Sequence, residues 1–436
     1  MKKDIINKIQ YARMKQVRMK QAGMILVSVI IFAAIAVTMT IGLVNWGTAL
    51  LLSVETVAQR EQALQIAEAG IDYYRWHLAH APTDFYDGTN STATSPYTHQ
   101  FFDKDGNLLG TYSLTITPPL AGSTAVTIVS KGTIASSTIS RSIKVIEAIP
   151  TLAQYALVYN LANNSSSTYV GSGFNTGRQL GMTATDFSST TANISAMKTQ
   201  AQSGGIYLPG SQYKDNPAFG YHIVLKTNNT FDLYVVTAVE ASLGDDCTSG
   251  GSDQTQWGLW TIDTQEFLQN YPIPANGLVF AEDNVWVDGT VKHSRISIVA
   301  AKSPDPGLGS EPNITVNDNL LYTNTDGSDV IGLISQGNIN IGYGSGDVQT
   351  VDGALLSQNG RVGRYHYVSD CGSSYDRTTL NIFGMIATNQ RYGFAYNDGT
   401  GYMNRNLTYD ANLFYNPPPF FPEISSYYST LSWQEI

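Results

Sequence analysis

One long apolar segment limits what this chain can fold into. Residues 24–54, MILVSVIIFAAIAVTMTIGLVNWGTALLLSV, hold 31 consecutive positions without a charged side chain. An α-helix rises about 1.5 Å per residue and needs about 20 apolar residues to cross the hydrocarbon core of a bilayer. We therefore expect a transmembrane helix over about residues 24–46, with Trp46 at the outer interface. The alternative is a cleaved secretory signal peptide, whose apolar region is usually only about 7–15 residues long.

Charge is distributed unevenly around this segment. Residues 1–23 contain seven Lys or Arg residues and one acidic residue, whereas the whole chain has a net charge of −10. Because basic residues stay on the cytoplasmic side of a membrane helix, we expect a cytoplasmic leader over 1–23 and a single-pass protein of the cytoplasmic membrane. The bulk would then be extracellular or periplasmic. The lipid bilayer is the implied partner, and an acidic body that repels phosphate argues against nucleic acid.

The helical pattern continues beyond the apolar segment. Apolar residues recur at intervals of three and four from Val54 to Leu78, with charged residues on the other face. No proline occurs between Met24 and Ala81, so one helix over 24–80 would be about 85 Å long. Alternating residues then predict an antiparallel sheet over 81–150. A hairpin turn is expected near Asp103, because the glycine and glutamate spacing of a calcium loop is missing there.

Two segments resemble a known family. The sequence KQAGMILVSVI at 20–30 and the helix end QALQIAEAGIDYYRWHL at 62–78 are similar to the PilX-like minor pilins and pseudopilins of type IV pilus systems. The resemblance implies that prepilin peptidase cuts after Gly23, leaving Met24 as the mature N-terminus, and that other pilins and pilus assembly proteins are partners. Main-type pilins carry glutamate at the fifth mature position, where this chain has Ser28. That difference is compatible with an initiating, capping or tip subunit.

The remaining chain shows strand patterns separated by Gly and Asn turns. We expect a strand-and-loop region over 151–275 and a β-solenoid, or β-helix, over 276–416. The segments GLISQGNINIG, GALLSQNGRVG and GMIATNQRYGF, which begin at 332, 353 and 384, are imperfect repeats of the short strands that stacked parallel coils require. An ordinary β-sandwich is the alternative. The aromatic and Pro-rich residues 417–436 are expected to cap the last coil, or else to form a flexible tail.

Taken together, these patterns predict a membrane-anchored α+β fold class. Its parts are a long N-terminal transmembrane helix, a pilin-like antiparallel sheet and a β-rich C-terminal domain. Motifs for catalysis are missing, since the sequence holds no P-loop, no GxSxG elbow and no HExxH motif. We therefore expect no cofactor and no metal. Cys247 and Cys371, the only cysteines, are expected to form a disulfide in an exported domain, with two separate thiols as the alternative.

Two classes of function remain. The first is a non-enzymatic pilus component, a tip or initiator minor pilin whose exposed β-domain serves adhesion, with surface glycans as candidate ligands. The second is a membrane-anchored carbohydrate-binding or carbohydrate-active β-helix protein, in which Asp347 and Asp352 could act as an acid pair. Because nothing in their spacing distinguishes these carboxylates from solvated turn residues, the sequence favours the first class.

Overall fold

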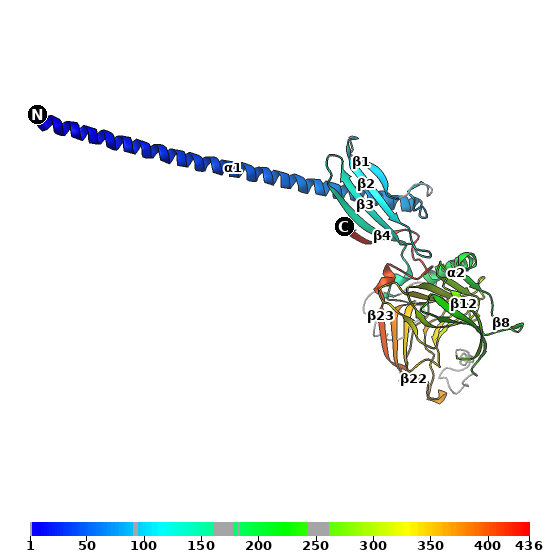
Figure 1. Cartoon of the computed structure of the whole chain (residues 1–436). Helices are drawn as coiled ribbons and strands as arrows, with labels where there is room; N and C mark the ends of the chain where they lie inside the picture. The colour runs from blue at the N-terminus through cyan, green and yellow to red at the C-terminus, as the bar shows by residue number, and fades with distance from the viewer. Residues whose placement is uncertain (1, 90–94, 160–177, 181–183, 242–260) are drawn as a thin grey trace.

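A single long helix forms the N-terminal part of the molecule. The computed structural model describes residues 2–89, 95–159, 178–180, 184–241 and 261–436. Helix α1 (Lys2–His80) has 79 residues and projects far beyond the folded body (Figure 1). It also includes residues 2–23, which we expected as a separate leader. This segment has no proline and is rich in Lys, Arg, Met and Gln, which favour helix. The helix ends just before Pro82, which cannot donate a backbone hydrogen bond.

The last turns of α1 lie on a five-stranded antiparallel sheet of order β1–β2–β3–β4–β24 (Figure 1). Its strands are β1 (Tyr97–Phe102), β2 (Leu108–Thr117), β3 (Val126–Ile134), β4 (Ser140–Ala148) and β24 (Ser429–Glu435). In the β1–β2 turn, Oδ1 of Asp103 accepts hydrogen bonds from the N–H groups of Asp105 at 2.9 Å and Asn107 at 2.8 Å. This carboxylate therefore holds a hairpin turn, as the sequence predicted.

The fifth strand of this sheet comes from the C-terminal tail. Strand β24 pairs with β4, so the C-terminus lies beside the antiparallel sheet (Figure 1). The expectation that residues 417–436 cap the last coil is wrong. Residues 417–419 instead lie against strand β15 (Arg295–Ala300), where the Ser297 hydroxyl donates to the Pro419 carbonyl oxygen at 2.5 Å. The last residues then return to β4, whose unpaired backbone groups favour the addition of a strand.

Between β4 and β24 in the sequence, the chain forms a second, mostly parallel sheet of 17 strands. In contrast to the strands and loops expected over 151–275, this region also contains a helix, α2. The elements in chain order are η1 (Leu152–Gln154), β5 (Leu157–Tyr159), β6 (Arg178–Leu180), α2 (Ala184–Gly204), β7 (Ile206–Leu208), β8 (Gln212–Tyr213), β9 (Asn216–Pro217), β10 (Gly220–Leu225), β11 (Thr230–Val239), β12 (Ile262–Pro272), β13 (Leu278–Ala281), β14 (Val285–Val291), β15 (Arg295–Ala300), β16 (Ile314–Val316), β17 (Leu320–Tyr322), β18 (Val330–Ser335), β19 (Ile339–Ile341), β20 (Val348–Ser357), β21 (Val362–Gly363), η5 (Ser369–Cys371), β22 (Asp376–Thr388), β23 (Gly401–Tyr409) and η6 (Ala411–Phe414).

Parallel pairing joins strands of successive repeats into three ladders. The first runs β7–β13–β15–β18–β20–β22–β5–β6, the second β10–β14–β16–β19–β21, and the third β14–β17–β20–β22–β23. The predicted repeats lie on neighbouring rungs of the first ladder, since Ser335 aligns with Ser357 and Ser357 with Thr388. The boundary expected at residue 276 is wrong, because strands from 157–225 form both ends of the first ladder and one end of the second.

Two apolar clusters hold this parallel part together. One contains fully buried residues from all three ladders, among them Leu333, Ile339 and Val351. The other lies on the opposite side of the first ladder, where Ile194, Met197 and Ala201 of α2 pack against strand residues that include Phe280 and Leu356. Helix α2 therefore covers the outer side of the first ladder.

The two parts of the body are joined by a pair of adjacent chain segments. The N–H of Leu152 donates to the Pro422 carbonyl oxygen at 3.0 Å, and the N–H of Ile424 donates to the Pro150 carbonyl oxygen at 2.9 Å. The parallel part is thus an insertion between β4 and β24 of the antiparallel sheet, entered and left at one place.

Candidate functional site

The first half of α1 presents apolar side chains to its surroundings. Between Met24 and Val57 its large apolar residues are exposed; the side chain of Phe32 is 71% exposed and that of Leu51 is 69% exposed. By length and composition the helix over Met24–His80 could cross a membrane, and no residue of its most apolar window is buried. A helix that is apolar on all sides is stable in lipid or against other apolar chains.

The predicted processing residues lie within this continuous helix. Gly23 and Met24 are both helical, and the Ser28 hydroxyl donates to the Met24 carbonyl oxygen at 2.9 Å. Ser28 therefore satisfies its own donor inside the helix and offers no charge to a neighbouring chain. Cleavage between Gly23 and Met24 stays a prediction.

Of the two cysteines predicted to form a disulfide, the structure describes Cys371. Cys371 is the last residue of η5, is 6% exposed and packs beside Tyr367. Cys247 lies outside the described residues. The bond between these cysteines therefore stays a prediction.

The second half of α1 is docked on the antiparallel sheet. Its buried face consists of Ala63, Ile66, Ala67, Ile71, Tyr74 and Leu78, at the spacing of three and four that the sequence showed. These side chains pack against buried strand residues such as Leu114, Ile128 and Val145. Each large apolar side chain that becomes buried contributes about 1.5–3 kcal/mol before entropy is counted, so this face holds the helix firmly to the sheet.

Glycines let the helix backbone approach the strands closely. A Cβ atom built on Gly132 of β3 would lie 2.5 Å from the Ala67 nitrogen and would also clash with the Ala63 carbonyl oxygen. On the helix side, a Cβ at Gly70 would lie 2.9 Å from the Tyr112 ring. Only residues without a Cβ fit at such contacts, which gives the glycine of the AEAG motif a packing role.

A buried carboxylate connects the helix with the C-terminal strand. Glu147 of β4 is 1% exposed and accepts a hydrogen bond from the Thr430 hydroxyl of β24 at 2.6 Å. Its Oε1 also lies 3.3 Å from Nε of Arg75 on α1. Burial raises the pKa of Glu147, although the hydrogen bond from Thr430 and the charge of Arg75 oppose that shift. Elements from the beginning, middle and end of the chain therefore meet at this one side chain.

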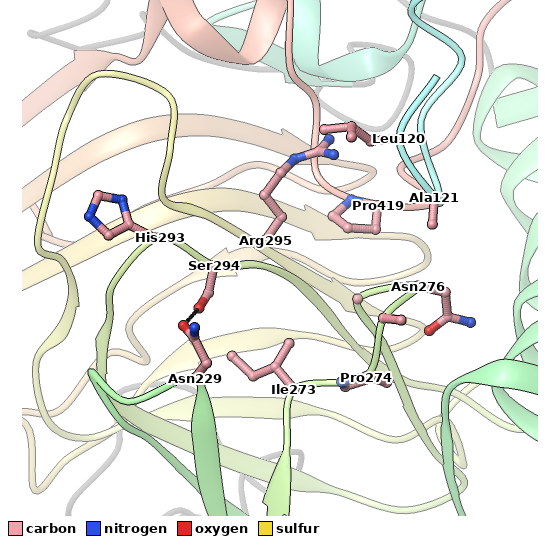
Figure 2. A pocket seen from close by; sticks show the side chains of 12 residues that line it. Leu120, Ala121, Asn229, Ile273, Pro274, Asn276, His293, Ser294, Arg295 and Pro419 are labelled. Atoms are coloured by element: carbon pink, nitrogen blue, oxygen red, sulfur yellow. Dashed lines mark hydrogen bonds between the residues drawn. The ribbon is translucent and has the colours of Figure 1, made fainter. Parts of the chain in front are cut away.

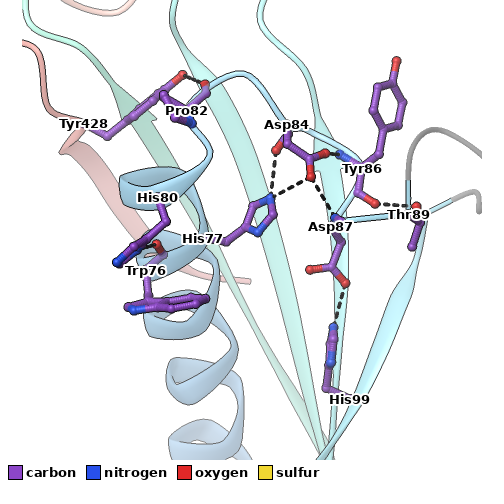
Figure 3. A network of polar contacts seen from close by, with 11 residues as sticks. Trp76, His77, His80, Pro82, Asp84, Tyr86, Asp87, Thr89, His99 and Tyr428 are labelled. Carbon is purple, nitrogen blue, oxygen red and sulfur yellow. Dashed lines mark hydrogen bonds and ion pairs between the residues drawn. The ribbon is translucent and has the colours of Figure 1, made fainter.

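A polar network fastens the segment after the helix (Figure 3). Nε2 of His77, in the last turn of α1, lies 3.0 Å from the Asp84 carbonyl oxygen and 3.4 Å from its carboxylate. That carboxylate also accepts a hydrogen bond from the N–H of Tyr86 at 2.8 Å. Nε2 of His99 on β1 lies 2.7 Å from the Asp87 carboxylate. Two His–Asp pairs therefore tie Asp84 to the end of α1 and Asp87 to β1.

The same region fixes neighbouring aromatic residues. Burial, and next the nearby Asp87 carboxylate, raise the pKa of the Tyr73 hydroxyl to about 12. The Tyr428 hydroxyl of the tail donates to the Pro82 carbonyl oxygen at 3.0 Å (Figure 3). His80 lies over Trp76 and contacts the Trp76 carbonyl oxygen through Nδ1 at 2.8 Å. These contacts give the histidines at the helix end structural partners, and the described residues contain no cluster suited to a metal ion.

The two carboxylates considered as an acid pair have structural partners. The Asp347 carboxylate accepts hydrogen bonds from the N–H and the hydroxyl of Thr378, which lower its pKa. The buried Asp352 carboxylate accepts a hydrogen bond from the N–H of Tyr322 at 2.8 Å. Both groups therefore stabilise backbone segments of the parallel part.

Sequence reasoning missed Glu147, Thr430 and Gly132 as residues of the helix docking site. The signal available for Glu147 was a charged residue at an apolar position of the alternating segment over 140–148. Gly132 interrupts another strand, which is typical of a close backbone approach. Nothing local could have placed Thr430 beside Glu147, because these residues are 283 positions apart.

No family model matches the chain, and no curated protein matches it. Among solved structures, the competence-associated pilin ComZ from Thermus thermophilus is similar to 87% of this chain, over 97% of its own length, with 16% sequence identity and a TM-score of 0.28. At this TM-score the superposition is loose.

Proposed function

We propose that this chain is a non-enzymatic, pilin-like subunit of a type IV pilus or a related system. Residues 24–46 would anchor it in the cytoplasmic membrane, with residues 1–23 inside and the folded body outside. The observation that carries this proposal is the division of α1 into an exposed apolar half and a half docked on an antiparallel sheet. Such a helix can leave the bilayer and pack with other apolar helices while its folded domain stays intact.

Removal of the leader is part of the same proposal. Prepilin peptidase would cut between Gly23 and Met24, leaving an apolar N-terminus without basic residues. Ser28 supplies no charge to pair with the new amine of a neighbouring subunit, which supports a tip or initiator position over repeated incorporation along a filament. Other pilins and pilus assembly proteins are then the partners.

The filament role can be tested in cells that produce the full chain. Surface filaments are sheared off and probed with an antibody against the parallel part, and immunogold labelling locates the protein along each filament. The proposal expects sparse label at filament ends and loss of label when the prepilin peptidase gene is deleted. Label confined to the cell membrane in both strains would contradict it.

We further propose that the parallel part is a β-solenoid that serves adhesion, with surface glycans as ligands. An outer stripe of polar side chains supports this proposal. Nδ2 of Asn406 donates to Oδ1 of Asn381 at 2.8 Å, and Nδ2 of Asn381 donates to the Thr350 hydroxyl at 3.3 Å, across neighbouring rungs of the third ladder. Amides and hydroxyls at this spacing suit the hydroxyl groups of a sugar chain.

Adhesion can be separated from carbohydrate degradation by one comparison. The full chain in detergent is incubated with a glycan array, and reducing ends are measured in parallel. The proposal expects retained glycan without new reducing ends, and weaker retention by Asn406→Ala. New reducing ends that disappear in Asp352→Asn would favour the carbohydrate-active alternative.

A further inference from the structure

A pocket of about 330 Å³ lies where the parallel part meets the antiparallel sheet (Figure 2). Leu120 and Ala121, from the loop that follows β2, and Pro419, from the tail, form part of its wall. The remaining wall comes from the segments over 273–277 and 293–295, together with Asn229. Its volume is at the lower end of the range of about 300–1,000 Å³ that is usual for small-molecule sites.

The pocket contains a guanidinium without a counter-charge. Nη2 of Arg295 donates to the Pro417 carbonyl oxygen at 2.6 Å, and no other hydrogen bond of this guanidinium occurs among the described residues. Its Nε is enclosed by protein atoms without a partner, so a ligand would meet the terminal nitrogens. No ion pair to Arg295 occurs among the described residues, and burial lowers its pKa. A mostly buried cation without an anion is unfavourable, so an anionic ligand at this place would relieve a cost already present in the fold.

The rest of the lining narrows the class of ligand. Hydrogen bonds from Ser328, and to a smaller extent the charge of His293, lower the pKa of Asp326, so this histidine already has an acidic neighbour. Apolar surface is supplied by Ile273, Pro274 and Pro419. One guanidinium beside apolar surface suits a monoanion with an apolar body better than a phosphate, which needs more donors.

We propose that this pocket binds a small organic carboxylate. Its charged end meets the guanidinium of Arg295, and its apolar body lies on Ile273, Pro274 and Pro419. Because Leu120 and Pro419 belong to the loop and tail that border the antiparallel sheet, a bound carboxylate contacts both parts of the body at once. This inference is independent of the proposed role in a pilus.

The test uses the full chain in detergent micelles and isothermal titration calorimetry. The probes are N-acetyl-L-leucine, its uncharged amide N-acetyl-L-leucinamide, and inorganic phosphate. Three variants are compared with the wild type. Arg295→Gln removes the charge, Leu120→Trp narrows the pocket at a residue that is 63% exposed, and Arg405→Gln is the matched control, because Arg405 likewise donates to backbone carbonyl oxygens.

The proposal expects the acid to bind the wild type at least about tenfold more tightly than the amide or phosphate. Arg295→Gln and Leu120→Trp should each weaken binding of the acid at least about tenfold, and Arg405→Gln should leave it unchanged. The acid–amide comparison uses the wild type, so it stands even if Arg295→Gln misfolds. The proposal would be overturned if the acid and the amide bind equally or if phosphate binds more tightly than the acid. It would also be overturned if both pocket variants bind the acid as the wild type does, or if the acid does not bind at about 10 mM.

Discussion

Replacing Gly132 with alanine tests how closely α1 is docked on the sheet. Real Cβ atoms essentially never come within 3.0 Å of a heavy atom, whereas this one would lie 2.5 Å from the Ala67 nitrogen. The atoms in its way belong to the helix backbone, and the Ala63 carbonyl oxygen lies nearer still, so α1 must retreat from β3 by about an ångström. Overpacking of this kind costs about 1–3 kcal/mol, and the lower entropy of the unfolded alanine chain returns about 0.4–1 kcal/mol. We expect a net destabilisation of roughly 1–2 kcal/mol.

The assay is hydrogen exchange of the full chain in detergent, because a two-part body does not give one melting transition. A loss of 1–2 kcal/mol should reduce protection of the docked helix half about 5–30-fold and leave the three ladders unchanged. Gly210→Ala is the control, since a Cβ at Gly210 meets nothing within 4 Å. Unchanged protection of the docked helix in Gly132→Ala, or an equal loss in Gly210→Ala, would refute the close docking.

Three further outcomes follow from the fold. Burial raises the pKa of Asp352 to about 6 from the ordinary 3.8, so the folded state binds the carboxyl proton more tightly than the unfolded state does. The free energy of unfolding therefore falls by up to roughly 3 kcal/mol as the pH rises from about 4 to 6. Asp352→Asn, which can still accept from Tyr322, should therefore stabilise the parallel part against urea at about pH 8 but not at about pH 4; an equal gain at both would contradict this. Replacing residues 152–422 by Asn-Gly should leave the antiparallel sheet folded by circular dichroism, because Thr151 and Glu423 already pair as antiparallel neighbours; loss of the strand signal would contradict the insertion topology. Cys247 and Cys371 should resist alkylation in the non-reduced protein, and quantitative labelling of both would exclude their disulfide.

The sequence predicted helices, repeats and turns correctly where residues close together in the chain determine the structure. The spacing of apolar residues predicted the docked face of α1 from Ala67 to Leu78 and the end of the helix before Pro82, although Val54 and Val57 of the same pattern are exposed. The repeats that begin at 332, 353 and 384 lie on neighbouring parallel rungs. The turn at Asp103 follows from contacts within five residues. Such features depend on local spacing and on turn chemistry, which the sequence contains directly.

Elements with distant partners were not predicted. Residues 429–435 form a strand only because β4 offers an open edge, and nothing near the tail identifies that edge. Helix α2 is rich in Ser and Thr, which favour helix weakly; its packing against the first ladder stabilises it instead. The insertion of the parallel part between β4 and β24 follows from the same long-range pairing. The docking residue Thr430 was missed for this reason.

The central claim is that prepilin peptidase removes residues 1–23 on the cytoplasmic side of the membrane. The remaining chain, with its folded body outside, would then be a pilin-like subunit. The most direct measurement is mass spectrometry of the N-terminus of the full chain, purified from cells with an active prepilin peptidase. Gly23→Val in the same cells serves as the uncleaved control. The account predicts a chain that begins at Met24 in the wild type and at Met1 in Gly23→Val. A wild-type chain that keeps Met1 in those cells would contradict it.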